Sequence, residues 1–231
     1  MHKNPAQNHK PAPHSFADVR LLIFDLDGTL IDSRLDLVNS VNATLQHLGR
    51  PELAHETIES YVGNGVTVLM RRALGPATSE EQIVTAQEFF LSYYRKHMLD
   101  HTVLYPGVAE ALESLRDRDM AVLTNKPVRF SEDILKGLGI ADHFRFVYGG
   151  NSFEQKKPDP IGVQTLLHDL DAQPEQAMMV GDSAVDVRTA RNAGIWACGV
   201  SYGLGLEGMR LDPPDIMLDT LADLPSHLNS D

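Results

Sequence analysis

Cysteine and long apolar stretches are scarce in this chain of 231 residues. A single cysteine, Cys198, excludes a disulfide within the chain and fits a reducing compartment. No apolar run approaches the roughly 20 residues that a membrane helix needs. The first residues also lack the apolar core of a signal peptide. We therefore expect a cytoplasmic protein that does not enter a membrane.

Positive charge is also in deficit. Lys and Arg number 20 against 32 Asp and Glu, which gives a formal net charge of -12. General nucleic-acid binding needs a basic face, so we expect no nucleic-acid partner. The same charge repels anionic ligands. Any phosphate must then be held locally, by a metal ion, a few basic side chains or helix N-termini.

The composition divides the chain into a tail and a folded part. Residues 1–17 are rich in Pro, Asn, His and Lys, which predicts a flexible N-terminal tail. The irregular spacing of the histidines there favours a solvated tail over a metal site. The remaining length suffices for one large domain, or for a domain with a smaller insertion.

Residues 33–103 have the pattern of a helical insertion. Apolar side chains recur at helical spacing over residues 38–48, 66–74 and 83–97. No strand pattern interrupts this region. We therefore predict that it forms a small helical domain, inserted as a unit.

The flanking segments, 18–32 and 104–231, have a different pattern. Apolar runs of strand length alternate there with helices of about 10 to 15 residues, which predicts a parallel sheet covered on both faces. The predicted fold is α/β, a Rossmann-like parallel sheet core with an inserted helical domain. Ligands of such sheets bind beyond the carboxyl ends of the strands. Three polar residues fall at predicted strand ends: Asp25, Thr124 and Asp182.

The segment Phe24-Asp25-Leu26-Asp27-Gly28-Thr29 carries the strongest functional signal. Asp25 and Asp27 follow a buried strand and are two residues apart, so their side chains can point to the same side. Two anions held that close repel each other unless a cation or a shared proton compensates. We therefore expect these carboxylates to act together on one reacting group.

A second acidic cluster lies at 182–186. Asp182 ends a strand, and Ser183 and Asp186 begin the next helix, where they can cap it for about 0.3–1 kcal/mol. Capping does not explain why Asp182 converges with the first pair of carboxylates. Several carboxylates with few soft ligands suit a hard cation, and Mg²⁺ above all when phosphate is present.

Cationic and neutral donors for a phosphate are also present. Lys156 and Lys157 precede Pro158, which biases Lys157 towards an extended backbone, although the sequence leaves open which lysine reaches the site. Thr124 and Asn125 follow a strand and offer uncharged donors.

Taken in order, four segments resemble the motifs of the haloacid dehalogenase superfamily. They are Asp25-Leu26-Asp27-Gly28-Thr29, Thr124-Asn125, Lys157-Pro158 and Gly181-Asp182-Ser183-Ala184-Val185-Asp186. The resemblance spans residues 21 to about 205. Within the superfamily, the chain is similar to the bacterial phosphoglycolate phosphatases through residues 61–66, 69–74 and 124–127.

The resemblance implies a role for each motif residue. Asp25 is the nucleophile, and Asp27 is the general acid and then the general base. Thr124 and Lys157 hold the phosphoryl group. The metal ion is Mg²⁺, with ligands from Asp25, the Asp27 carbonyl and Asp182. Supporting roles are expected for Thr29, Ser183 and Asp186.

By the same resemblance, residues 33–103 form a cap over the site, with hinges near 32–33 and 104–105. The loop Gly63-Asn64-Gly65 precedes a helix, so its N–H groups could bind a small carboxylate. Arg71 or Arg72 could assist from that helix. The residues expected to bind substrate are Asn125, Gly63, Asn64, Gly65 and Arg71.

The expected function is that of a Mg²⁺-dependent phosphatase that hydrolyses a small phosphate monoester, with 2-phosphoglycolate as the leading candidate substrate. The protein is expected to act as a monomer or a homodimer. The same core serves phosphatases of other sugar phosphates and phosphomutases, which return the phosphoryl group to a sugar. Dehalogenation does not use the second aspartate, so Asp27 argues against it. A non-catalytic binding protein would lack a catalytic carboxylate, yet Asp25, Asp27 and Asp182 are all present.

Overall fold

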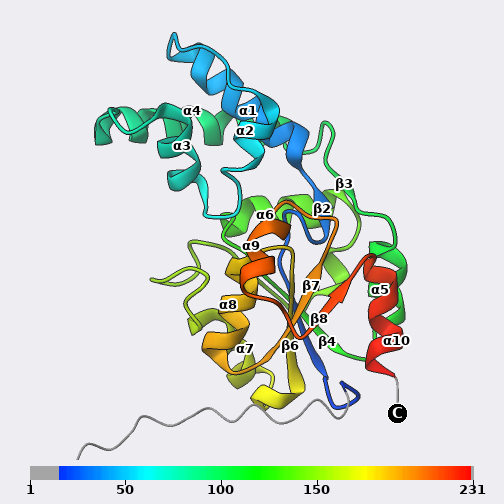
Figure 1. The fold of residues 1–231 in the computed structure, drawn as a ribbon. Helices are drawn as coiled ribbons and strands as arrows, with labels where there is room; N and C mark the ends of the chain where they lie inside the picture. Colours follow the sequence, from blue (N-terminus) through cyan, green and yellow to red (C-terminus); the bar gives the residue numbers. More distant parts are fainter. Residues whose placement is uncertain (1–15, 230–231) are drawn as a thin grey trace, which may run out of the picture.

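A six-stranded parallel sheet with the order β5-β4-β1-β6-β7-β8 forms the centre of the larger domain (Figure 1). The computed structural model describes residues 16–229, so most of the predicted tail lies outside the described residues. The strands are β1 (Leu21–Phe24), β4 (Asp119–Leu123), β5 (Phe146–Tyr148), β6 (Ala177–Gly181), β7 (Trp196–Val200) and β8 (Ile216–Leu218). The predicted α/β fold is confirmed.

Helices cover both faces of this sheet, because successive side chains of a strand point to opposite faces. Leu22 and Phe24 of β1 pack in one apolar cluster, with α5, α6 and α10. Leu21 and Ile23 pack in another, with α7, α8 and α9. These helices are α5 (Val108–Ser114), α6 (Val128–Gly137), α10 (Leu224–Leu228), α7 (Ile161–Asp169), α8 (Ala184–Ala193) and α9 (Leu206–Leu211), with short 3-10 helices η1 (Ala141–His143), η2 (Pro174–Gln176) and η3 (Leu221–Asp223).

Register within the sheet positions the polar strand ends. Phe24, the last residue of β1, pairs with Val122 of β4 on one side and Val180 of β6 on the other. Because β4, β1 and β6 are neighbours and run parallel, Thr124, Asp25 and Asp182 emerge at the same edge of the sheet.

The inserted helices gather at one end of the molecule, away from most of the sheet (Figure 1). They are α1 (Arg34–His47), α2 (His55–Glu59), α3 (Val66–Leu74) and α4 (Glu80–His97). Two linkers join them to the core, and these pair as short antiparallel strands, β2 (Ile31–Asp32) with β3 (Val103–Leu104). The sequence analysis did not detect this ladder, since two-residue strands carry no periodic signal. None of the described helices is both long and apolar enough to cross a membrane.

Phe16 lies within the predicted tail but packs against the core. Its ring meets Trp196 edge-on, with 5.2 Å between the ring centroids. The contact covers part of the first apolar cluster.

Candidate active site

Asp25 lies directly after β1, with its side chain only 12% exposed. Its Oδ1 accepts the Leu26 N–H at 2.7 Å and lies 2.9 Å from Lys157 Nζ. Its Oδ2 takes part in no described hydrogen bond, which leaves that oxygen available for attack or for a metal ion. The chain then turns at Gly28, whose φ of 84° suits glycine. A Cβ at that position would collide with the Asp182 carboxylate, so the loop and Asp182 are in close contact.

Lys157, not Lys156, reaches Asp25. Its Nζ lies 2.9 Å from Asp25 Oδ1 and donates to Asp186 Oδ1 at 2.6 Å, with both partners largely buried. Burial opposes the lysine charge, but the attraction of Asp186 and Asp25 outweighs it and raises the pKa of Lys157. Lys156 lies instead beside Gly65 of the helical insertion.

Three carboxylates, those of Asp25, Asp182 and Asp186, converge at this edge of the sheet. One oxygen of each lies within 4.8 Å of the others. Burial, then repulsion from Asp186 and Asp25, raises the pKa of Asp182 to about 8. Burial also raises the pKa of Asp25 to about 6, against the attraction of Lys157. The cluster therefore resists full ionisation unless positive charge is added.

Asp182 and Asp186 are held by different partners. Asp182 Oδ2 accepts the N–H groups of Leu204 and Gly205, at 2.6 and 3.2 Å. Asp186 Oδ2 accepts from the Ser183 N–H and hydroxyl, at 3.1 and 2.7 Å, which caps the start of α8. Asp186 thus caps its helix with one oxygen and fixes Lys157 with the other.

Asp27 is bound by a residue whose role the sequence analysis missed. Lys126 Nζ donates to both carboxylate oxygens of Asp27 at 2.9 Å, and the Ser33 hydroxyl donates to Oδ1 at 2.5 Å. The Lys126 side chain is only 5% exposed and lies against the Tyr94 ring, 4.8 Å from its centroid. The sequence did contain a signal for this role, because Lys126 follows Thr124 and Asn125 directly after a predicted strand.

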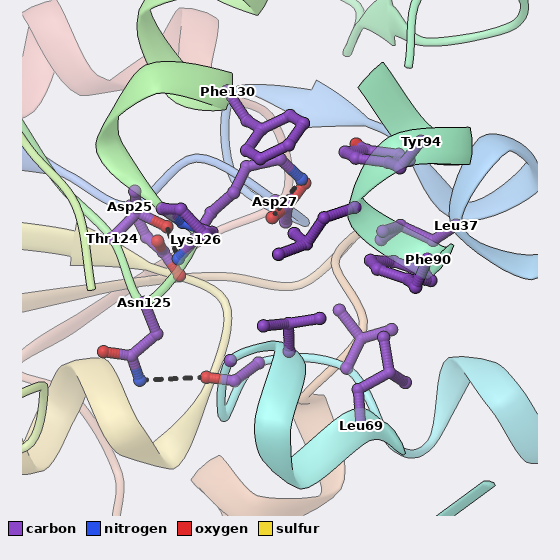
Figure 2. Close-up of a pocket in the computed structure, with 16 residues that line it drawn as sticks. Asp25, Asp27, Leu37, Leu69, Phe90, Tyr94, Thr124, Asn125, Lys126 and Phe130 are labelled. Atoms are coloured by element: carbon purple, nitrogen blue, oxygen red, sulfur yellow. Dashed lines mark hydrogen bonds and ion pairs between the residues drawn. The ribbon is translucent and has the colours of Figure 1, made fainter. Parts of the chain in front are cut away.

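A pocket opens between the inserted helices and the edge of the sheet that carries Asp25 and Asp27 (Figure 2). Its polar wall belongs mainly to the core and its apolar wall mainly to the insertion. Asn125 closes one side, because its Nδ2 donates to the Gly63 carbonyl at 3.0 Å and to the Lys157 carbonyl at 3.2 Å. The lining residues are Asp25, Asp27, Leu37, Val62, Gly63, Gly65, Val66, Leu69, Phe90, Leu91, Tyr94, Thr124, Asn125, Lys126, Pro127 and Phe130.

Comparison with known proteins identifies the family of this chain. Residues 22–200 match the family model described as haloacid dehalogenase-like hydrolase. The chain belongs to the haloacid dehalogenase-like hydrolases.

Its relatives are similar over nearly their full length. A phosphoglycolate phosphatase of Vibrio vulnificus is 39% identical, over 90% of this chain and 95% of the relative. A phosphoglycolate phosphatase of Chromobacterium violaceum is 41% identical, over 80% of this chain and 86% of the relative. A solved structure described as a predicted phosphoglycolate phosphatase from Haemophilus somnus has a TM-score of 0.86 at 32% identity, covering 90% of this chain and 97% of that one. The prediction of an enzyme of the phosphoric monoester hydrolase class is confirmed.

The donor set at the acidic cluster fits the metal expected of this family. The converging atoms are carboxylate oxygens, which Mg²⁺ prefers. Burial, and then repulsion between the carboxylates, raises the pKa values of Asp25 and Asp182, and a cation at the cluster would oppose both effects. Asp186 belongs to the same cluster, although Lys157 occupies one of its oxygens and Ser183 the other.

Thr124 and Thr29 occupy different positions relative to the pocket. Thr124 lines the pocket beside Asp25, and its hydroxyl accepts the Lys126 N–H at 3.3 Å. Thr29 is fully buried under the first loop, and its carbonyl accepts the Tyr202 hydroxyl at 2.8 Å. That contact uses the backbone of Thr29, and its side-chain hydroxyl has no hydrogen-bond partner among the described residues, so its supporting role stays a prediction.

The predicted residues of the insertion are only partly brought together. Gly63 and Gly65 line the pocket, whereas Asn64 is not among its described lining residues. Arg71 is also absent from that lining, because its side chain is 52% exposed and pairs with Glu80 at 2.6 Å. The structure therefore gives no support for substrate binding by Arg71. Arg72 is exposed as well, and it donates to the Tyr61 carbonyl at 3.3 Å.

Proposed function

We propose that this protein is a Mg²⁺-dependent phosphatase that hydrolyses 2-phosphoglycolate to glycolate and phosphate through an aspartyl-phosphate. One observation carries the proposal. Asp25 lines the pocket beside Asp27 and lies 2.9 Å from the buried ammonium of Lys157. A nucleophilic carboxylate, a second carboxylate for proton transfer and a cation for the phosphoryl oxygens thus share one cavity.

In the first step, a carboxylate oxygen of Asp25 attacks phosphorus. The bond between phosphorus and the ester oxygen breaks, and Asp27, which must take up a proton before this step, gives that proton to the leaving alkoxide. Lys157 and the Thr124 hydroxyl stabilise the phosphoryl oxygens while charge redistributes. Asp186 keeps the Lys157 ammonium in place through its 2.6 Å contact.

In the second step, water attacks the phosphorus of the aspartyl-phosphate. Asp27 now accepts a proton from that water, the bond to the Asp25 oxygen breaks, and inorganic phosphate leaves. The Ser33 and Lys126 contacts fix the orientation of the Asp27 carboxylate for both transfers.

The residues that would hold Mg²⁺ are Asp25, Asp182 and the Asp27 carbonyl, with Asp186 in the same cluster. A bound Mg²⁺ neutralises charge on the phosphoryl oxygens and lowers the repulsion between carboxylates. Residues 33–103 would act as the cap that excludes bulk water during the first step.

Support for 2-phosphoglycolate comes from the relatives named as phosphoglycolate phosphatases, which match this chain along most of their length. The apolar wall formed by Leu37, Leu69, Phe90 and Phe130 favours a second candidate, an ester with a larger and partly apolar organic group. We expect the enzyme to work in the cytoplasm, where its buried Cys198, whose pKa burial raises, stays reduced.

A panel of phosphate esters, assayed with Mg²⁺ and with EDTA, tests the proposal. We expect rapid release of phosphate from 2-phosphoglycolate with Mg²⁺ and loss of that activity with EDTA. Preference for an ester with a larger, partly apolar organic group would favour the second candidate. Transfer of the phosphoryl group to another sugar hydroxyl, rather than to water, would indicate a mutase.

A further inference from the structure

Lys126 is the one cationic side chain among the described residues that line the pocket. Lys157 is not among those lining residues and is engaged by Asp25 and Asp186. Arg71, expected from the sequence to supply charge on the cap side, faces Glu80 instead. Any anionic group of the substrate other than its phosphate therefore has Lys126 as its available counter-ion in the described lining.

The Lys126 ammonium has donor capacity left after binding Asp27. An ammonium has three N–H donors, and the two Asp27 oxygens at 2.9 Å account for two of them. The Tyr94 ring supports the cation from the other side, 4.8 Å away. The third donor adjoins Tyr94 rather than a carboxylate, so a ligand oxygen in the pocket would compete only with a neutral group for it.

The Tyr94 hydroxyl lies next to this cation, and its own proton has no acceptor among the described residues. The tyrosine is 2% exposed, its hydroxyl is buried, and the residue lines the pocket. Figure 2 shows its oxygen at the end of the ring nearer Asp27 and Lys126. Burial raises the pKa of Tyr94 to about 12, so the hydroxyl keeps its proton and can donate. Buried polar groups normally have partners, which points to a ligand oxygen here.

We propose that Lys126 and Tyr94 bind an acid group on the leaving alcohol of the substrate, so that the pocket selects phosphate esters of short hydroxy acids. The inference rests on the proposed function, because it assumes that Asp27 protonates the leaving oxygen. The leaving alcohol then lies on the Asp27 side of the pocket, and both donors adjoin that side. A carboxylate one carbon from the ester oxygen can accept from both.

An acid suits these donors better than a neutral hydroxyl. A carboxylate on Lys126 forms a charge-assisted hydrogen bond, about twice as strong as a neutral one. The net charge of -12 disfavours an anionic substrate in general, so local positive charge is needed to hold its second anionic group. The apolar side chains around the subsite exclude water and strengthen the contact.

Two esters of similar size test the proposal, 2-phosphoglycolate and 2-hydroxyethyl phosphate. The first carries a carboxylate where the second carries a neutral CH₂OH group. The readout is the ratio of their kcat/KM values for the same enzyme with Mg²⁺. We expect the wild type to favour the acid. Lys126→Met should reduce that ratio roughly 10- to 100-fold, mainly through KM for the acid, and Tyr94→Phe by about threefold to tenfold.

Matched controls come from the same helix as Tyr94. Lys96→Met and Tyr93→Phe alter partly or fully exposed residues of α4 and should leave the ratio unchanged. Lys126→Arg keeps a cation and should restore part of the acid preference, which separates charge from a folding defect.

Two results would overturn the inference alone. In one, Lys126→Met lowers kcat/KM equally for both esters, which would mean that Lys126 only positions Asp27. In the other, the wild type hydrolyses both esters with no preference for the acid. A wild-type enzyme that hydrolyses neither ester would instead overturn the proposed function, and this inference with it.

Discussion

The Asp36 carboxylate accepts hydrogen bonds from both the backbone and the side chain of Thr102, although the two residues lie 66 positions apart. Asp36 Oδ2 accepts the Thr102 N–H at 2.9 Å and the Thr102 hydroxyl at 2.8 Å. The same carboxylate accepts the N–H of His101, and His101 Nδ1 lies 2.8 Å from its Oδ1. Asp36 is near the start of α1, and Thr102 precedes β3. The carboxylate thus ties together the two chain segments that enter and leave the insertion.

Replacing Asp36 with Ala should destabilise the protein by about 2–4 kcal/mol, because the buried N–H and hydroxyl of Thr102 would lose their acceptor. Urea unfolding followed by circular dichroism measures the change in the free energy of unfolding. Asp100→Ala is the control, since Asp100 is exposed and its side chain contacts only exposed His97. That control should stay within about 0.5 kcal/mol of the wild type. An equally small effect of Asp36→Ala would show that the hydrogen bonds between Asp36 and Thr102 do not stabilise the fold.

The convergence of Asp25, Thr124 and Asp182 could be predicted because parallel strands share one carboxyl edge. Each residue follows an apolar run, and only adjacency of β4, β1 and β6 was needed to bring them together. The choice between Lys156 and Lys157 could not be made from sequence, since it depends on the path of the loop across that edge.

Contacts that depend on helix rotation were harder to predict. Arg71 and Leu69 share α3, and Leu69 faces the pocket, so a rotation of two residues carries Arg71 away from it towards Glu80. The contacts Asp36–Thr102 and Asp27–Lys126 each join segments that are distant in sequence. No spacing rule connects such residues before the fold is known.

Asp25→Asn should abolish phosphate release, by at least ~10³-fold in kcat, because the amide cannot form the aspartyl-phosphate. The fold should persist, since Asn keeps the shape and removes a buried carboxylate whose pKa is raised to about 6. Steady-state phosphate release and the thermal unfolding midpoint are the two measurements. Asp117→Asn, at an exposed position, is the control for loss of one charge. Turnover by Asp25→Asn near the wild-type rate would remove the nucleophile assignment.

Gly65→Ala should reduce kcat/KM by about tenfold or more through the docking of the cap loop. Gly65 has φ of 82°, and an added Cβ would lie 3.1 Å from Lys156 Nζ and 3.3 Å from the Asn125 carbonyl. Gly75→Ala is the matched control, because its φ of 83° and ψ of 167° nearly equal the 82° and 165° of Gly65, with no neighbour within 4 Å of an added Cβ. Kinetics of both variants separate the two effects. Equal kinetic losses in both would assign the effect to backbone strain rather than to loop docking.

The acidic cluster should make stability depend on pH and on Mg²⁺ together. The pKa of Asp182 is raised from 3.8 to about 8, mainly by burial, so the folded state binds more protons than the unfolded state between these values. Its contribution to stability is therefore complete below about pH 3.8 and is lost as pH rises through about 8. Without metal, the unfolding midpoint of the wild type should fall relative to Asp182→Asn over this window.

Mg²⁺ should reverse that trend, because it binds the ionised carboxylates and favours the folded state. Thermal unfolding of the wild type and Asp182→Asn, each at several pH values between 5 and 9 with EDTA or with Mg²⁺, gives the four curves needed. We expect the stabilisation by Mg²⁺ to grow with pH in the wild type and to be much weaker in the variant, which has lost one carboxylate of the cluster. Equal stabilisation of both proteins at every pH would place the metal outside this cluster. A metal-free wild type that gains stability relative to the variant as pH rises would show that Asp182 is not held in its protonated form by burial.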